Sequence, residues 1–367
     1  MKTVTADMRH SSLRILSLPG REFTGNPYID LCCDALERAG MSLVNIHTSQ
    51  ARLFKFDILH LHWPQHYVTE RSIYKALIFS TTLIIYMMLA KLLRKSIVWT
   101  VHDVKPMRAR HPRLLRLHLA YVRALVDAYV FMNPSSASEF TEYFPRARKK
   151  LAWQVPHGPY PVPPTSPQHA AALRCRFSGG TDCLIVGFLG DIRPYKNAEM
   201  LAYLPPRDLI GRDIKILVAG AADSTYDIEE IEAPLKRIPP KQLVRIPERL
   251  SDQCLADIIR AVDLVLLPYL WGSNSGFGMF VLSCGQRLLC SALPMFTDLA
   301  NDLGPPWIYI FDHEAQDLLA ELERGLSRFQ HDQVGPEAKI RLQRFLEDRS
   351  FDHGAQQLRQ LNERLGH

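Results

Sequence analysis

The chain has 367 residues, which fits two domains of ordinary size better than one. Hydrophobic residues make up 47% of it and charged residues 22%, which is typical of a folded globular protein and excludes a disordered chain. Seven cysteines without a C-x-x-C pair argue against a disulfide framework or a zinc site and favour free thiols in a reducing cytosol. The N-terminal stretch MKTVTADMRHSSLR lacks an apolar core, so we expect no signal peptide.

Positive charge is concentrated in the first half of the chain. Residues 1–150 carry 22 Lys and Arg against 11 Asp and Glu, whereas residues 151–367 carry 22 against 27. This asymmetry predicts an anionic partner for the first half. Nucleic acid is not expected, because no helix-turn-helix, zinc-finger or RNA-binding signature occurs. A membrane surface is the other common anionic partner.

Short apolar runs alternate with helical patterns along the first part of the chain. The helical pattern at 27–39 ends at Gly40. The runs predict strands at 13–18, 42–46, 57–61, 96–101, 128–132 and 153–155. Continuous apolar strands that alternate with helices indicate a parallel sheet covered on both faces.

A proline-rich stretch, HGPYPVPPTSP at 157–167, suits neither a helix nor a central strand and predicts an interdomain linker. The alternation then restarts. Strands are predicted at 184–189, 214–219, 244–246, 264–267 and 288–290, and helices at 315–329 and 338–361.

The predicted fold class is α/β, with two Rossmann-like doubly wound domains that face each other across a cleft. We place the first domain at 1–160, the linker at 161–174 and the second domain at 175–345. A C-terminal helix, 346–367, is expected to pack back on the first domain. Ligands of such sheets bind beyond the carboxyl ends of the strands.

The loop GFLGDIRPYKN, at 187–197, follows the first strand of the second domain and precedes an expected helix. Gly190 allows close backbone approach, Arg193 presents a forked donor to phosphate oxygens, and Lys196 adds a point charge. A helix N-terminus also attracts anions. The loop therefore predicts a diphosphate site, with a solvated basic loop as the alternative. No G-x-G-x-x-G or Walker A sequence supports a dinucleotide or P-loop site.

A second loop, LLPYLWGSNSGFGMFVLSCG, follows the strand at 264–267 and leads into another helix. Its small polar residues are typical of an anion cradle, with a structural glycine turn as the alternative. Both loops lie at carboxyl strand ends of one domain. Together they predict a nucleotide-diphosphate site formed by Gly190, Arg193, Lys196, Tyr269, Ser273, Asn274, Ser275 and Gly276.

Several segments in order resemble a known family: NPYIDLCCDAL (26–36), DILHLHWPQHY (57–67), TVHDVKPM (100–107), HG (157–158) and the two loops above. They are similar to GT-B glycosyltransferases and, more narrowly, to the β-mannosyltransferases of xanthan-type exopolysaccharide assembly. The resemblance covers most of residues 12–312. It implies transfer of mannose from GDP-mannose to a polyprenyl-diphosphate-linked oligosaccharide, with the donor on the second domain and the acceptor on the first.

Retaining GT-B enzymes of the large common family carry two glutamates separated by seven residues, and the matching positions here are Ser275 and Ser283. Neither is a carboxylate, so an inverting transfer with a base near the acceptor hydroxyl is implied. The resembled family has Asn after T-x-H and Glu after H-W-P, where this chain has Asp103 and Gln65.

For the catalytic base we expect Asp103, with His62 as the alternative; His62 is equally compatible with a hydrogen-bonded structural role. The expected acceptor or cleft residues are Asn26, Tyr28, Trp63, His102 and His157. Asn26 also suits a helix N-cap ahead of Pro27. The absence of D-x-D predicts no metal and no other cofactor, so that Arg193 and Lys196 stabilise the leaving group.

The stretch KALIFSTTLIIYMMLAK, at 75–91, has 15 uncharged residues between two lysines. As a helix these rise about 22 Å, less than the roughly 30 Å hydrocarbon core, so a transmembrane span is not expected. A buried core helix is one interpretation. Basic residues follow at Lys91, Arg94, Lys95, Arg108, Arg110, Arg113, Arg116 and Arg123. They favour monotopic docking of a cytoplasmic protein on the anionic inner membrane.

The sequence leaves three alternatives open. One is a retaining or UDP-sugar-dependent GT-B transferase, and another is an inactive membrane-bound scaffold with the same fold. A nucleic-acid-binding role has only the basic first half in its favour.

Overall fold

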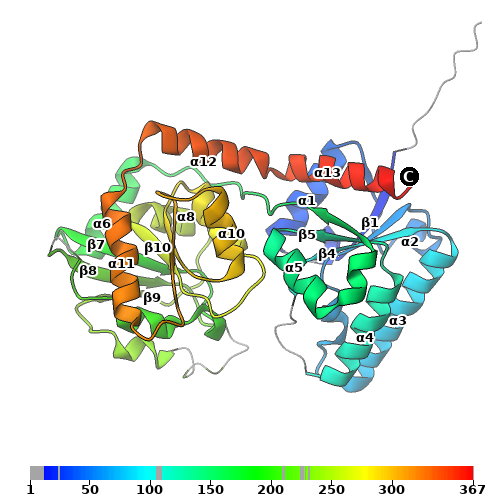
Figure 1. Cartoon of the computed structure of the whole chain (residues 1–367), viewed down its shortest axis with the longest axis horizontal. Helices are drawn as coiled ribbons and strands as arrows, with labels where there is room; N and C mark the ends of the chain where they lie inside the picture. Colours follow the sequence, from blue (N-terminus) through cyan, green and yellow to red (C-terminus); the bar gives the residue numbers. More distant parts are fainter. Residues whose placement is uncertain are drawn as a thin grey trace, which may run out of the picture. The chain divides into compact units, whose positions relative to one another are not determined.

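The structure is a computed structural model that describes residues 12–23, 25–104, 110–208, 211–223, 227, 229 and 232–366. The chain divides into two compact units (Figure 1). Unit 1 comprises Met1–Pro156 together with Phe351–His367, and unit 2 comprises His157–Ser350. Arg108 of the predicted basic run lies outside the described residues.

Unit 1 is built on a six-stranded parallel sheet with the strand order β2-β1-β3-β4-β5-β6. The strands are β1 (Arg14–Leu18), β2 (Ser42–Leu43), β3 (Ile58–Leu61), β4 (Ser96–Val101), β5 (Ala128–Phe131) and β6 (Leu151–Gln154). The strand order reverses at β1, so the loops after β1 and β3 leave the sheet at a topological switch point.

Helices cover both faces of this sheet. One face packs against α3 (Ile73–Leu92), α4 (Pro112–Leu125) and α5 (Pro134–Tyr143). The opposite face packs against α1 (Pro27–Arg38) and α13 (Phe351–Arg364). The remaining short helices of unit 1 are η1 (Arg21–Phe23), α2 (Ser49–Arg52), η2 (Pro64–Val68) and η3 (Pro145–Lys149).

The C-terminal helical region differs from the single helix expected at 338–361. It forms α12 (Pro336–Asp348) in unit 2 and α13 in unit 1. At the break, the N–H groups of Arg349 and Ser350 donate to carbonyls three residues back, which closes the last turn of α12. Beyond it, α13 packs on α1 through Ala355, Leu358 and Leu361.

Unit 2 has a second six-stranded parallel sheet, with the strand order β12-β11-β10-β7-β8-β9. Its strands are β7 (Cys183–Leu189), β8 (Asp213–Ala219), β9 (Leu243–Ile246), β10 (Leu264–Leu267), β11 (Leu288–Ser291) and β12 (Ile308–Phe311). The order reverses between β7 and β10, which places the switch point between these two strands.

One face of this sheet packs against α6 (Pro167–Ser178), α8 (Asp252–Ala261), α9 (Gly276–Ser283), α10 (Pro294–Asp302) and α12. The other face packs against η5 (Ala198–Tyr203), η6 (Leu235–Arg237) and α11 (Leu318–His331). The short helix η4 (Pro194–Lys196) lies in the loop after β7. The prediction of two doubly wound α/β domains is confirmed for the two sheets.

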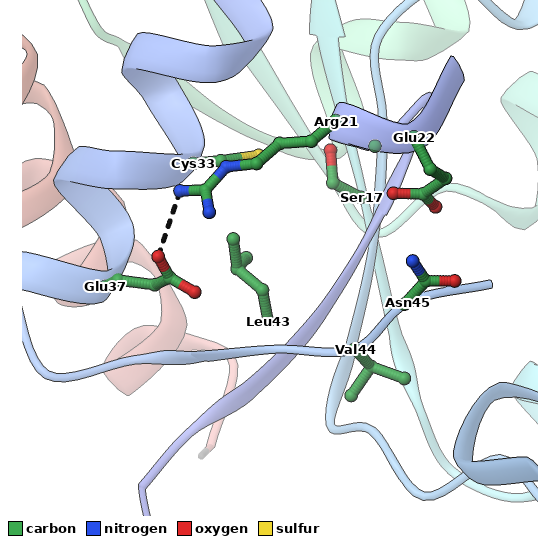
Figure 2. A pocket seen from close by; sticks show the side chains of 9 residues that line it. Ser17, Arg21, Glu22, Cys33, Glu37, Leu43, Val44 and Asn45 are labelled. Atoms are coloured by element: carbon green, nitrogen blue, oxygen red, sulfur yellow. Dashed lines mark hydrogen bonds and ion pairs between the residues drawn. The ribbon is translucent and has the colours of Figure 1, made fainter. Parts of the chain in front are cut away.

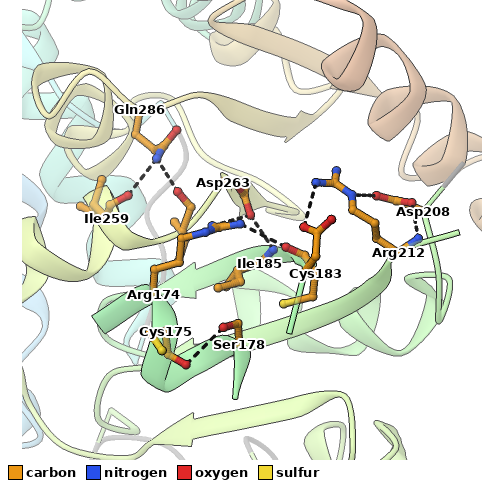
Figure 3. Close-up of polar contacts among 12 residues, drawn as sticks. Arg174, Cys175, Ser178, Cys183, Ile185, Asp208, Arg212, Ile259, Asp263 and Gln286 are labelled. Carbon is orange, nitrogen blue, oxygen red and sulfur yellow. Dashed lines mark hydrogen bonds and ion pairs between the residues drawn. The ribbon is translucent and has the colours of Figure 1, made fainter. Parts of the chain in front are cut away.

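Polar contacts fix the amino ends of the central strands of unit 2 (Figure 3). The Asp263 carboxylate, just before β10, accepts hydrogen bonds from Arg174 Nη1 and from the backbone N–H of Ile185, both at 2.8 Å. Gln286 donates to the carbonyls of Ile259 and Val262. These contacts set the register of β7 and β10 and hence where their carboxyl ends lie.

Some predicted boundaries differ in the structure, and two of them change the description of the fold. The strand expected at 42–46 is shorter, since β2 spans only Ser42–Leu43. The stretch 161–174, expected as a linker, includes the first turns of α6. Pro167 at the first helical position and the Ser166 hydroxyl, which accepts a bond from His169 N, start that helix.

Candidate functional site

The carboxyl ends of β7 and β8 approach each other more closely than side chains would allow. Gly190 follows β7 with φ of 81°, and Gly220 follows β8 with φ of 145°. A Cβ atom on Gly220 would lie 2.1 Å from the Gly190 carbonyl oxygen. Only glycine fits at position 220. The sequence analysis predicted Gly190 and missed Gly220, whose signal is its place directly after the predicted strand 214–219.

The loops after β7 and β10 are joined to each other. Leu270 N donates to the Tyr195 carbonyl at 2.8 Å. The Tyr195 ring lies edge-on to Tyr269 at 5.3 Å and contacts Trp271 at 4.9 Å, both between ring centroids. Both predicted loops therefore form one surface at the switch point.

A cavity of about 360 Å³ opens at this point in unit 2. It takes in seven of the eight residues predicted for the diphosphate site, and Tyr195. It also takes in residues that the sequence analysis missed: Asp191, Gly220, Arg249, Leu250, Asp252, Leu255 and Phe277. Of the eight predicted residues, Ser273 is buried and is not among the lining residues, while Tyr269, although buried, lines the cavity.

The seven predicted residues that line the cavity are Gly190, Arg193, Lys196, Tyr269, Asn274, Ser275 and Gly276. The cavity volume falls in the range typical of small-molecule sites. Four of the missed residues, Arg249, Leu250, Asp252 and Leu255, lie at the start of α8 or just before it, in a stretch without a phosphate-binding motif.

Lys196 is the buried cation of this cavity, with 7% of its surface exposed. Burial, together with the charge of the nearby Arg193, lowers the pKa of its ammonium to about 8, while Asp191 opposes the change. The ammonium lies 5.4 Å from the Phe277 ring centroid and 6.0 Å from that of Tyr269. These rings compensate part of the desolvation of the charge. An anion in the cavity would compensate the rest.

Arg193 lies beside Lys196 and is held by carboxylates. Its Nε lies 2.8 Å from Asp223 Oδ2, and its Nη2 lies 3.7 Å from Asp191 Oδ2. A guanidinium has five N–H donors in a fixed plane, so this orientation leaves donors for an incoming anion.

The N-terminus of α9 completes the cavity. Ser275 caps this helix by accepting a hydrogen bond from Gly278 N at 3.0 Å. Gly276 leaves room for its neighbours, because a Cβ there would lie 2.8 Å from Tyr160 Oη and 3.5 Å from His157 Nε2. His157, expected among the acceptor residues, thus lies beside the start of α9, and burial lowers its pKa to about 4.

The α-helix expected after the 187–197 loop is absent, and that expectation is wrong. The described chain instead forms η4 and η5, separated by Asn197 in the left-handed region with φ of 58°. A six-residue 3-10 helix followed by Pro205 and Pro206 develops little dipole. The positive potential at this loop therefore comes from Arg193 and Lys196, and the helix contribution comes from α9.

In unit 1, β3 and β4 bring three predicted residues together at their carboxyl ends. His62 Nδ1 and His102 Nε2 form a hydrogen bond of 3.1 Å. The Trp63 ring stacks on His102 with a centroid distance of 3.9 Å. His62 is 1% exposed, and burial lowers its pKa well below the ordinary value, so the ring is neutral at pH 7.

The start of α1 adds the other two predicted residues. Asn26 caps the helix, because its side chain accepts a hydrogen bond from Tyr28 N at 3.1 Å. The sequence analysis expected this N-cap role as the alternative to a role in acceptor binding. The Tyr28 ring lies edge-on to His102 at 4.8 Å and to His62 at 6.0 Å. Tyr28, His62, Trp63 and His102 therefore form one aromatic cluster.

Asp103 directly follows His102 and is partly exposed. Burial of its carboxyl raises its pKa to about 6. The carboxylate is ionised at pH 7 and, with a pKa near the working pH, is well suited to accept a proton. Within the described part of the chain, no cluster of three or more His, Cys, Asp or Glu side chains is arranged to hold a metal ion.

Two doubly wound parallel sheets with this connectivity form the GT-B fold. HepE of Anabaena, solved in complex with UDP, superposes with a TM-score of 0.64 at 14% identity, over 97% of this chain and 99% of that one. Sucrose-phosphate synthase of Thermosynechococcus elongatus superposes with a TM-score of 0.63 at 14% identity, over 96% and 98%. These likenesses confirm the predicted fold.

The comparison of sequences points to a narrower group of proteins than the comparison of folds does. The chain is 23% identical over 289 residues to GDP-mannose:glycolipid 4-beta-D-mannosyltransferase of Xanthomonas campestris pv. campestris. The match covers 79% of this chain and 76% of that protein. The resemblance seen in the motifs is confirmed at this level. No protein-family model matches the sequence.

The pKa of Lys196 leads us to predict that nucleotide binding depends on pH. The ammonium is charged below its pKa of about 8 and loses its charge above it. We predict that GDP affinity, measured by calorimetry from pH 7 to 9, falls about tenfold as this proton is lost. Lys196→Arg stays charged throughout and should remove most of the dependence. An equal fall in both proteins would show that Lys196 does not contact the nucleotide.

Proposed function

We propose that the chain is a glycosyltransferase of the GT-B type that transfers mannose from GDP-mannose, with inversion, to a lipid-linked oligosaccharide in exopolysaccharide biosynthesis. The observation that carries the proposal is the cavity of unit 2, where Arg193 and the buried Lys196 meet the N-terminus of α9. This set of groups suits a diphosphate. The name of the Xanthomonas relative supports mannose, GDP and a glycolipid acceptor.

Inversion is supported by the two positions that match the glutamates of retaining enzymes, because this chain has Ser275 and Ser283 there. Ser275 caps α9, and the Ser283 hydroxyl accepts from Tyr160 N and donates to the Met279 carbonyl. Both side chains have structural partners, and neither supplies a carboxylate. In the proposed reaction Asp103 takes the proton of the acceptor hydroxyl while that oxygen attacks the anomeric carbon. Arg193 and Lys196 stabilise the departing diphosphate without a metal.

A UDP-sugar donor is the second candidate, because HepE was solved with UDP and with UDP-glucose. A thermal-shift panel of GDP, UDP, ADP and dTDP separates the two. We expect GDP to raise the melting temperature most, since a ligand at a hundred times its Kd stabilises the native state by about 2.7 kcal/mol. Turnover of GDP-mannose by the purified protein should follow. A larger shift with UDP than with GDP would make a UDP-sugar the donor. If the protein turned over no donor sugar, the inactive scaffold would be the remaining interpretation.

The proposed base is tested by Asp103→Asn, which keeps the shape of the side chain and removes its basicity. Transfer should fall about 10²–10⁴-fold while GDP affinity stays unchanged. Wild-type kcat/KM should rise with pH through about 6, where Asp103 ionises, and this step should vanish in the variant. Glu70→Gln, an exposed carboxylate of the same unit, is the matched control. Near-normal transfer by Asp103→Asn would exclude it as the base and leave His62 as the next candidate.

A lipid-linked acceptor requires access to a membrane, and α3 supports a docking surface for it. By length and composition this 20-residue helix is apolar enough to span a bilayer, with a mean hydropathy of 1.7. It buries a single stripe against unit 1, formed by Ala76, Ser80, Leu83, Met87 and Ala90. The other face exposes Tyr74, Ile78, Ile85, Met88 and Leu92, up to 77% for Tyr74 and Leu92. We propose that this face lies in the membrane interface.

Basic residues beside α3 supply the charge for an anionic leaflet. Arg94, Arg110, Arg113 and Arg116 are exposed. Lys91 and Arg123 of the predicted run have partners within the unit instead. Lys91 forms an ion pair with Asp127 at 2.6 Å, and the Arg123 guanidinium lies 3.8 Å from the Phe144 ring centroid.

Liposome flotation tests the docking. Binding should require anionic lipid and weaken with salt, because each cation near the surface contributes about 1 kcal/mol. Replacing Arg110, Arg113 and Arg116 with glutamate should abolish flotation. The same charge reversal at Arg146, Arg148 and Lys149, which lie on η3, is the matched control and should reduce it much less. Equal loss in both triple variants, or equal flotation on neutral vesicles, would contradict this surface.

A further inference from the structure

A second cavity lies in unit 1, apart from the aromatic cluster described above. Its volume is about 410 Å³, and it opens where β1 and β2 end beside α1. Its lining combines polar groups from three segments with the apolar side chains of Leu43 and Val44 (Figure 2). The polar or ionisable lining residues are Ser17, Arg21, Glu22, Cys33, Glu37 and Asn45.

The charges of this cavity exclude an anionic ligand. Arg21 is its single lining cation in the described part of the chain. Arg21 is already ion-paired with Glu37 at 2.9 Å and with Asp34. Glu22 adds a further carboxylate with no basic partner among the described residues. The cluster is therefore net negative and repels phosphate, nucleotide or uronate groups.

The uncommitted polar atoms form a mixed set of donors and acceptors. Asn45 Oδ1 accepts a bond from His47 N at 2.8 Å, which leaves the amide NH₂ group as a donor. The Ser17 hydroxyl donates to the Pro19 carbonyl at 2.9 Å and retains lone pairs as an acceptor. Among the residues that the structure describes, the Glu22 carboxylate has only a long contact, 3.5 Å from Ile46 N. Such a set matches hydroxyl groups, each of which both donates and accepts.

The lack of a side chain at Gly20 determines where the Glu22 carboxylate lies. A Cβ atom on Gly20 would come within 2.7 Å of Glu22 Oε2, so the absent side chain lets the carboxylate fold back over the loop. The oxygens displaced in this way are the end of a flexible side chain. A methyl group at position 20 would therefore move the carboxylate without disturbing the backbone of β1.

We propose that this cavity binds a neutral saccharide unit, with Glu22 and Asn45 contacting its hydroxyl groups. Leu43 and Val44 provide the apolar contact that a pyranose ring makes with its C–H face. The biological ligand is then a neutral sugar of the oligosaccharide acceptor. This assignment of the ligand rests on the proposed function. The binding chemistry itself is independent of the donor site.

Saturation-transfer NMR on the full chain tests this site with a panel of cellobiose, maltose, methyl mannoside and glucuronate. We expect transfer from the protein to at least one neutral sugar and much weaker transfer to glucuronate. Glu22→Ala and Asn45→Ala should each weaken neutral-sugar binding at least about fivefold, in line with the loss of one hydrogen bond to a charged or polar group. Gly20→Ala should weaken it to a smaller extent. Glu142→Ala, an exposed carboxylate on α5, is the matched control and should bind as the wild type does.

GDP binding by the same proteins separates the two proposals. It should be unchanged in Glu22→Ala and Asn45→Ala, which also shows that these variants are folded. No transfer to any neutral sugar, or transfer that Glu22→Ala and Asn45→Ala leave unaltered, would overturn the saccharide site. If GDP fails to bind the wild type while sugar binding depends on Glu22, the proposed donor function is wrong and the saccharide site stands.

Discussion

The buried charge of Lys196 is the constraint on which the proposed chemistry depends. A lysine with only 7% of its surface exposed is costly to keep charged unless a counter-charge compensates it. Aromatic rings and Asp191 compensate part of this cost, and the pKa of Lys196 still lies lowered, at about 8. A diphosphate in the cavity would restore the charge balance. The cost is thus a property of the free protein that ligand binding relieves.

The position of Lys196 depends on the fold of unit 2 and not on the local sequence alone. The strand order reverses between β7 and β10, so their loops diverge and leave space at the sheet edge. Gly220 lets the chain after β8 pass against the Gly190 carbonyl, and Leu270 ties the second loop to Tyr195. Asp263 and Gln286 fix the strands at their opposite ends. Each of these contacts involves at least one residue that lies far from Lys196 in the sequence.

Much of this arrangement was predictable, because it rests on periodicity and on residues directly after apolar strands. Eleven of the strands follow from apolar runs, whereas β12 at Ile308–Phe311, a short edge strand, was not predicted. The 3-10 geometry of η5 was missed because it depends on the left-handed Asn197, for which the sequence offers only a weak signal. Arg249, Asp252 and Phe277 reach the cavity through tertiary packing, and the cavity beside Glu22 depends on how α1 lies against β2. No local pattern specifies such contacts.

The central claim is that Arg193 and Lys196 hold the diphosphate of a nucleotide sugar. Calorimetry of GDP binding at pH 7 tests it most directly, with Arg193→Ala compared against Lys215→Ala, a partly exposed cation on β8 that does not line the cavity. The account predicts that Arg193→Ala weakens GDP binding by about 10–150-fold, because a charge-assisted hydrogen bond worth about 1.5–3 kcal/mol is lost. Lys215→Ala should leave GDP binding unchanged. Wild-type affinity in a folded Arg193→Ala protein would contradict it.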